Sequence, residues 1–265
     1  MPDVYTHGHH ESVLRSHTWR TVANSAAYLA GSLRPGMSLL DVGCGPGTLT
    51  IDLARHVLPG RVVGVDAASG VLEGARARAA EAGVDVEFVV GDVYRLDAPD
   101  DSFDVVHAHQ VLQHLTDPVA ALREMRRVCR PGGIVAVRDA DFGAFTWHPE
   151  APGLEDWRML YRDVTQANRA ECHAGRRLLA WALAAGFTDV TPGASVWCFA
   201  TPEERRWWAS VWAERTVHSD FAAQAKSYRL ADDVLLESLH DAWLEWGEAP
   251  EGWFACVHGE LIARA

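Results

Sequence analysis

The sequence has almost no lysine, few cysteines and no long apolar run. Lys226 is the only lysine among 24 basic residues. The five cysteines are odd in number and widely spaced, and no C-x-x-C pair occurs, which argues against a disulfide framework or a zinc cluster. No segment approaches the ~18 apolar residues of a membrane span, and the N-terminal region lacks the apolar core of a signal peptide. We therefore expect a protein of the reducing cytoplasm with no membrane span.

Acidic residues outnumber basic ones, 36 against 24, for a formal net charge of -12. Binding to a phosphate backbone needs clustered lysine and arginine, so we expect no nucleic-acid partner. The 265 residues are 48% hydrophobic, which suits a globular chain with a sizeable core. This length favours one enlarged domain or a domain with a cap.

The stretch LLDVGCGPGTLT, at residues 39–50, organises the chain. Residues 39–42 form a short apolar run typical of a buried parallel strand, and a helical pattern follows from residue 48. Between them stand Gly43, Gly45 and Gly47. Glycine permits positive φ and lets a ligand lie against the backbone. Strand, glycine turn and helix together predict the first unit of a doubly wound α/β nucleotide-binding sheet.

Acidic residues mark the ends of the first strands. Asp41 precedes the glycines, Asp66 ends the next apolar run, and Asp92 follows Gly91 after a third one. A carboxylate at the position of Asp66 can accept hydrogen bonds from both hydroxyls of an adenosine ribose. Asp92 is a candidate to hold the exocyclic amine of an adenine.

The order D-x-G-x-G-x-G, strand-end Asp and GD resembles the class I S-adenosylmethionine-dependent methyltransferases. The resemblance covers about residues 36–140 and is strongest to the small-molecule branch similar to quinone-biosynthesis methyltransferases. It implies S-adenosyl-L-methionine as cofactor and S-adenosyl-L-homocysteine as product. It also implies a mostly parallel seven-stranded sheet of order 3-2-1-4-5-7-6 with strand 7 antiparallel. The alternative is a Rossmann-type domain that binds NAD or another nucleotide, although the G-x-G-x-G spacing differs from the dinucleotide-binding pattern.

By this resemblance, an N-terminal helix folds over the cofactor and helps to close the site. Arg20 is then placed to pair with the methionine carboxylate, and the alternative is an ordinary surface arginine. The residues that we assign to the cofactor are Tyr5, Arg20, Asp41, Gly43, Cys44, Gly45, Gly47, Asp66, Ala67, Gly91, Asp92, Val93, His109 and Gln110.

The N-terminal segment also contains His7, His9 and His10. No cysteine or acid cluster supports a metal site there, so we interpret these histidines as a solvated arm and expect no metal. A single helix is expected from Ser12, which is a candidate N-cap. Ser69 is a second candidate N-cap, for a helix over residues 69–82.

The rest of the chain predicts four further strands and helical insertions. The strands are expected at residues 103–109, 134–137, 195–200 and 253–264. Ten of the eleven tryptophans lie from Trp147 onward, in or near the insertions. We interpret residues 1–265 as one Rossmann-like domain, with a core of about 36–140, 175–200 and 252–265 and a cap from 1–30, 142–174 and 201–251.

Methyl transfer needs a positioned acceptor, and it needs a general base only when the acceptor must lose a proton first. The candidate catalytic residues are His109, His114 and Asp139, near the ends of the fourth and fifth strands. The candidate acceptor-binding residues are Asp141, Trp147, Arg169, His173 and Trp197.

The sequence favours an enzyme that methylates O, N or C of a small organic acceptor. One alternative is a protein of the same fold that binds the cofactor but catalyses a cyclisation or isomerisation. Another is a non-catalytic partner in an assembly. A homodimer is compatible with the sequence and is not required by it.

Overall fold

Five parallel strands bring their carboxyl ends to one edge of the sheet. The computed structural model describes residues 3–8 and 10–265. β1 (Leu39–Val42) lies between β2 (Val62–Asp66) and β4 (Phe103–His109), with β3 (Glu87–Val90) beyond β2 and β5 (Cys129–Ala140) beyond β4. Because parallel strands end together, the residues that follow β1, β2 and β4 meet at one edge, where open α/β sheets bind ligands.

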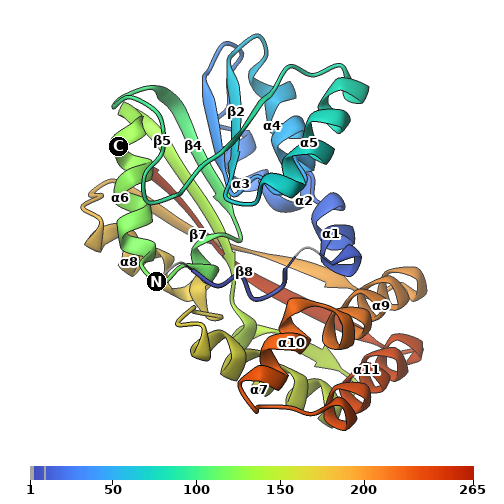
Figure 1. The fold of residues 1–265 in the computed structure, drawn as a ribbon. Coiled ribbons are helices and arrows are strands. Elements are labelled where there is room, and N and C mark those ends of the chain that lie inside the picture. The colour runs from blue at the N-terminus through green and yellow to red at the C-terminus, as the bar shows by residue number, and fades with distance from the viewer. Residues whose placement is uncertain (1–2, 9) are drawn as a thin grey trace.

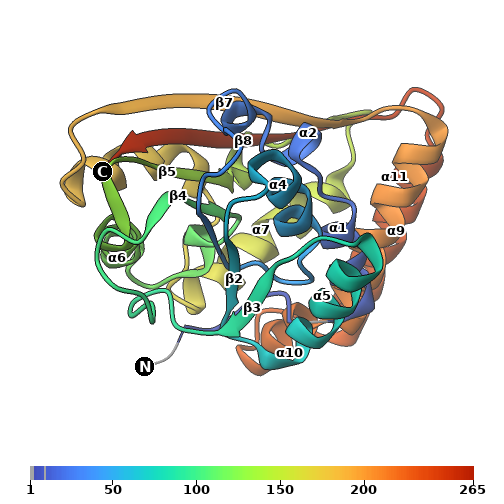
Figure 2. The ribbon, with the colours of Figure 1, turned by 90° about the horizontal axis from the view of Figure 1, so that it is seen from above.

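A long antiparallel strand, β8 (Trp253–Arg264), closes this side of the sheet. It pairs with β5 on one edge and with β7 (Val190–Phe199) on the other. The predicted order, with its antiparallel seventh strand, is therefore confirmed. An additional short strand, β6 (Thr146–His148), pairs with the start of β8 and was not predicted. Figure 2 shows β7 and β8 running side by side along the molecule.

Helices cover both faces of the sheet. Apolar residues of β1 and β2 alternate between two core clusters, as expected for strands buried on both sides. One face is covered by α2 (Val22–Ser25), α3 (Ala27–Ala30), α4 (Thr48–Val57) and α5 (Ser69–Ala82). The other face is covered by α6 (Pro118–Val128) and α8 (Leu178–Ala184).

The N-terminal segment forms three short helices, so the expectation of one helix from Ser12 was wrong. α1 (Glu11–Thr18) is capped by His10, whose ring accepts from the Ser12 backbone amide. A capping box between Thr21 and Asn24 then starts α2 in a new direction. Ser69 is likewise inside α5, which has no side-chain cap.

Four helices form a second layer beyond the sheet edge, gathered at the end of β8 away from the C-terminus (Figure 1). They are α7 (Pro152–Ala167), α9 (Pro202–His218), α10 (Asp220–Ser227) and α11 (Asp233–Glu248). Most of the buried tryptophans pack here in one aromatic cluster. α1 packs on α9, whereas α2 and α3 lie on the sheet face with α4, although we had assigned residues 1–30 to the cap.

The described residues also form three short 3-10 helices, η1 (Leu112–His114), η2 (Phe142–Ala144) and η3 (Ala174–Arg177). Within the described residues, none of the helices is long and apolar enough to cross a membrane.

Gly259 tests how tightly β8 is held. A Cβ there would collide with the carbonyl oxygen of Gly175 in η3. We expect Gly259→Ala to lower the free energy of unfolding by about 2 kcal/mol or more, because backbone cannot yield as a side chain can. Gly31→Ala, where a Cβ meets nothing within 4 Å, should stay within about 0.5 kcal/mol of wild type. Urea denaturation measures both, and equal stabilities of the two variants would contradict the packing described.

Candidate functional site

The glycine loop between β1 and α4 is held in a shape that only glycine accepts readily. Gly43, Gly45 and Gly47 have φ values of 70°, 52° and 78°. A Cβ on Gly43 would collide with Val111, and one on Gly47 would lie 2.8 Å from Ala75. At Gly45 the backbone is open, since the nearest atom to a Cβ would be a His17 ring nitrogen at 3.9 Å. The loop therefore leaves a backbone surface against which a ligand can lie.

Asp66 links this loop to the end of β2. Its carboxylate accepts from the backbone amides of Gly45 and Ala68, each at 2.9 Å. The side chain is half-buried, and each carboxylate oxygen keeps a second lone pair for a ligand hydroxyl. At the end of β3, the carboxylate of exposed Asp92 accepts from the Tyr94 amide at 2.9 Å.

Asp41 lies under the loop and is 3% exposed. One carboxylate oxygen accepts from the Thr50 hydroxyl at 2.6 Å, and the other lies 2.7 Å from His107 Nδ1. Its predicted role at the cofactor is therefore indirect, since both oxygens are engaged by the protein. The Cys44 thiol is also buried, and this burial raises its pKa far above the usual range. Cys44 can therefore contribute only backbone atoms to a ligand at the loop.

Three further residues assigned to the cofactor lie at the ends of β2 and β3. Ala67 is exposed, and Gly91 and Val93 are half-buried. All three are at the same sheet edge as Asp66, as the parallel pairing of β2 and β3 requires.

An aromatic cavity lies beside this edge, between the sheet and the helical layer. Its free volume is about 30 Å³, so the residues that line it must rearrange before an acceptor can enter. The residues that line it are Tyr5, His7, Ser16, His17, Arg20, Gln110, Gln113, His114, Ala140, Phe142, Phe145, Trp197, Trp208, Trp212, Arg215, Cys256 and His258.

A directional chain of hydrogen bonds crosses one wall of the cavity. Arg20 donates to Gln110 Oε1 at 2.5 Å, and Gln110 Nε2 donates to His258 Nε2 at 2.8 Å. His258 Nδ1 then donates to the Cys256 carbonyl at 3.0 Å. Gln110 has φ 54°, which is uncommon away from glycine and is found at functional sites. The hydrogen bond between Arg20 and Gln110 therefore fixes both side chains where the end of β4 meets the cavity.

His114 lines the cavity but is poorly suited to take a proton. Burial lowers its pKa to about 3, with Arg20 and Arg215 adding to the effect. The side-chain oxygen of Gln113 accepts a hydrogen bond from the Ala140 backbone N–H. Its side-chain nitrogen therefore donates to His114 Nε2, at 3.0 Å. The proton is thus on His114 Nδ1, which has no partner within the described chain. This ring presents an unpaired donor.

His109 and Asp139 lie behind the cavity wall and do not line it. Burial holds the pKa of His109 well below its usual value, and neither ring nitrogen is hydrogen-bonded to any described residue. Asp139 is fully buried, and its carboxyl group accepts a hydrogen bond from the backbone N–H of Gln113 at 3.0 Å. Burial raises its pKa to about 8, so this carboxyl is mostly protonated at neutral pH.

Of the five candidate acceptor-binding residues, only Trp197 lines the cavity, and its indole donates to the Asn24 carbonyl at 2.5 Å. Asp141 instead forms a forked ion pair with Arg176, at 2.5 and 2.8 Å. Arg169 is exposed at the end of α7. Trp147 lies in a separate surface groove, where Arg158 stacks on it at 5.3 Å.

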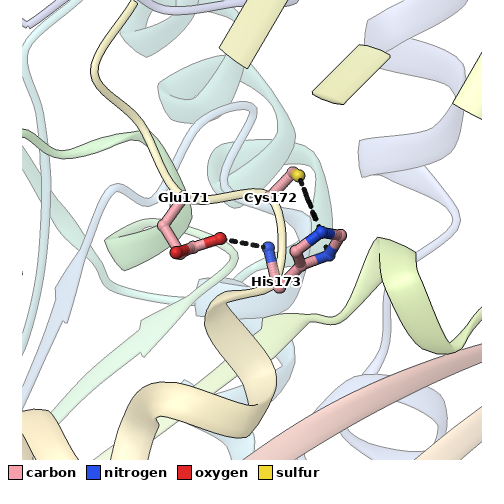
Figure 3. A group of neighbouring side chains, drawn as sticks. All are labelled: Glu171, Cys172 and His173. Atoms are coloured by element: carbon pink, nitrogen blue, oxygen red, sulfur yellow. Dashed lines mark hydrogen bonds between the residues drawn. The ribbon is translucent and has the colours of Figure 1, made fainter. Parts of the chain in front are cut away.

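Glu171, Cys172 and His173 form a cluster with metal-ligand side chains (Figure 3). Glu171 accepts from the His173 backbone amide at 3.0 Å and pairs with Arg177 at 3.0 Å. His173 Nδ1 accepts from the Gly143 amide at 2.9 Å, and burial raises the pKa of the Cys172 thiol to about 11. The bonds of Glu171 and His173 Nδ1 hold the turn before η3, and His173 lies outside the cavity.

Sequence reasoning missed His7, Arg215 and His258, which all line the cavity. The expectation of a solvated arm is wrong for His7, which is buried and lies 3.0 Å from the Tyr161 hydroxyl; His9 lies outside the described residues. A signal for Arg215 did exist. It follows Trp208 and Trp212 at helical spacing, so it interrupts the buried face of α9.

Comparisons with known proteins identify the family to which the chain is similar. A family model described as a methyltransferase domain matches residues 33–208. An uncharacterized methyltransferase of Schizosaccharomyces pombe is 33% identical, over 98% of this chain and 96% of that protein. A ubiquinone/menaquinone biosynthesis C-methyltransferase of Bdellovibrio bacteriovorus is 40% identical, over 39% of this chain and 44% of that protein.

Among solved structures, the 4+2 cyclase SpnF has a similar fold. Its TM-score is 0.54 at 22% identity, over 99% of this chain and 88% of that chain. The predicted resemblance to S-adenosylmethionine-dependent methyltransferases is confirmed by the family model and the relatives.

The raised pKa of Asp139 predicts a stability that depends on pH. Because the native state holds this proton more tightly than the unfolded state, its stabilising effect is complete below about pH 3.8 and is lost as the pH rises to about 8. We expect Asp139→Asn, which mimics the protonated acid, to gain on wild type between pH 5 and pH 7.5 by up to about 1.4 kcal/mol per pH unit. Urea denaturation at several pH values measures this, with exposed Asp85→Asn as control. Parallel curves for wild type and Asp139→Asn would contradict the assignment.

Proposed function

Because the chain belongs to the S-adenosylmethionine-dependent methyltransferases, we propose that it methylates an oxygen, nitrogen or carbon atom of a small organic acceptor held in the aromatic cavity. The observation that carries this proposal is the position of that cavity. Arg20 and Gln110, which line the cavity, lie at the end of β4. β4 pairs with β1, so the cavity is next to the sheet edge that holds the glycine loop and Asp66.

The residues at the sheet edge fit the adenosine part of the cofactor. Asp66 is fixed by two backbone amides and retains lone pairs for the two ribose hydroxyls. Asp92, at the end of the adjacent strand, would accept from the adenine amine. The loop at Gly45 is open where a Cβ would otherwise stand, so it can carry the methionine portion against its backbone.

Arg20 would bind the methionine carboxylate. Burial lowers its pKa to about 9, and Arg215 and Arg138 contribute to the shift, yet the guanidinium stays charged at neutral pH. The guanidinium donates to Gln110 Oε1, and its Nε has no hydrogen-bond partner among the described residues. Tyr5, which lies in the segment above, would cover this end of the cofactor.

The protein's contribution would be to position the acceptor and exclude water rather than to take its proton. Bound S-adenosylmethionine supplies an already activated methyl group. Among the described residues, no carboxylate lines the cavity, and burial keeps His114 neutral and weakly basic. An acceptor atom that is already nucleophilic as it binds, such as a neutral amine, an ionised hydroxyl or an enolate carbon, needs no base from these groups.

The similarity to a cyclase favours one alternative, in which the cavity orients a substrate for cyclisation or isomerisation without methyl transfer. We further propose a cytoplasmic location, because the five cysteines are all free. A homodimer stays a prediction.

The role of Asp66 can be tested by isothermal calorimetry. We expect Asp66→Ala to weaken binding of S-adenosylmethionine and S-adenosylhomocysteine at least about 10-fold, because two charge-assisted hydrogen bonds are lost. Asp85→Ala, an exposed change before β3, should bind as wild type does. Unchanged affinity in Asp66→Ala would refute the assignment.

Turnover separates methyl transfer from cyclisation. With a library of small phenols, enols and amines, methyl transfer releases one S-adenosylhomocysteine per product molecule and adds 14 mass units, the replacement of H by CH₃, to the acceptor. Mass spectrometry measures both. A product of unchanged mass, formed without S-adenosylhomocysteine, would favour the cyclase alternative.

A further inference from the structure

The aromatic cavity is electrically unlike the rest of the protein. The chain carries a formal net charge of -12. Arg20 and Arg215 line the cavity, however, and no aspartate or glutamate does so among the described residues. The ionisable groups around the two arginines supply little negative charge. Burial raises the pKa of Tyr5 to about 12 and that of Tyr161 well above its usual value, so both phenols are neutral.

Arg215 is the cation of the cavity that the proposed cofactor site does not use. It is 4% exposed, and burial lowers its pKa to about 10. It donates to the Ser16 hydroxyl at 2.8 Å and to the Ser12 carbonyl at 3.4 Å. Its Nε has no hydrogen-bond partner in the described part of the chain, and no carboxylate there forms an ion pair with it.

A buried guanidinium without a carboxylate is unusual, because desolvation of a lone charge is costly. The nearby arginines of this protein show the contrast. Arg138 is also buried, and it is paired with Glu260 at 3.2 Å. Arg15 is half-exposed and pairs with Glu214 at 2.9 Å. Arg215 therefore has donor capacity and charge left for a ligand.

The cofactor does not neutralise this charge. S-adenosylmethionine carries one carboxylate, one ammonium and one sulfonium, so its net charge is +1. If its carboxylate pairs with Arg20, the second arginine still lacks an anion. The acceptor is the remaining component of the site that can bring one.

The other cavity walls favour a flat, apolar body. Phe142 and Phe145 stack with ring centroids 4.5 Å apart. Trp212 stands edge-on to Phe142 at 6.0 Å and lies under the Arg215 guanidinium at 4.4 Å. Aromatic side chains arranged in this way bind planar rings through stacking and edge contacts.

We propose that the acceptor is a planar organic acid whose carboxylate pairs with Arg215 while its ring lies among Phe142, Phe145 and Trp212. This inference rests on the proposed function, since it assigns the acceptor class of the same cavity. A guanidinium binds a carboxylate through two parallel hydrogen bonds. A single arginine with one unpaired His114 donor suits a monoanion better than a phosphate dianion, which would need more donors.

The test measures binding to enzyme saturated with S-adenosylhomocysteine. The probes are benzoate, 2-hydroxybenzoate and 1-naphthoate, each compared with its carboxamide by calorimetry. The amides keep the ring and shape but lose the charge. We expect at least one acid to bind about 10-fold or more tightly than its amide, because its bonds to Arg215 are charge-assisted.

Variants then locate the effect. Arg215→Gln should lose about 10-fold or more in affinity for the acid and little for the amide, with S-adenosylhomocysteine binding unchanged. Arg215→Lys keeps the charge without the fork, so it should retain the preference for the acid at reduced affinity. Arg206→Gln, an exposed change on the same helix, is the matched control.

Equal affinities of wild type for each acid and its amide would overturn the proposal, and so would an acid preference that survives Arg215→Gln. The wild-type comparison decides the matter even if Arg215→Gln does not fold. Failure of S-adenosylhomocysteine to bind wild type would instead refute the proposed function itself.

Discussion

A buried carboxylate joins the three elements on which the site depends. Asp41 on β1 contacts His107 on β4 and the Thr50 hydroxyl of α4, at 2.7 and 2.6 Å. These contacts fix the strand before the glycine loop, the helix after it and the neighbouring strand. Since Asp41 and His107 are almost fully buried, the loss of either would leave the other without its partner in a site closed to water. These buried contacts of Asp41 thus hold the glycine loop in place, and with it Asp66, which is hydrogen-bonded to Gly45.

The second half of the chain supplies what the minimal sheet lacks. β8 continues past β5 and pairs with β6. η2 follows β5 and packs on β8, and α9 follows β7, which pairs along β8. The N-terminal segment covers the resulting cavity with Tyr5 and His7. With so little free volume, the cavity must open before an acceptor binds, and its closure would exclude water from the reacting groups. Arg20 and Gln110 connect the end of β4 to the aromatic cavity.

Local patterns were sufficient for the sheet and for the glycine loop. The apolar run, the glycines and Asp66 are neighbours in sequence or occupy equivalent strand ends, so the parallel order alone brings them together. The acceptor side depends on contacts between distant segments. Asp141 follows β5 as predicted, but Arg176 on η3 engages its carboxylate. Arg215 and His258 enter from α9 and β8, whose packing no local pattern specifies.

The most direct test of this account is the binding of cofactors to the wild-type protein by isothermal calorimetry. The sheet edge has the half-buried Asp66 carboxylate and an open glycine loop, and Arg20 lies beside them; we propose that these residues bind the ribose and the methionine carboxylate. We predict micromolar or tighter binding of both S-adenosylmethionine and S-adenosylhomocysteine, and no binding of NAD. Binding of NAD alone would contradict the account, because the glycine loop, Asp66 and Arg20 would then serve a different ligand.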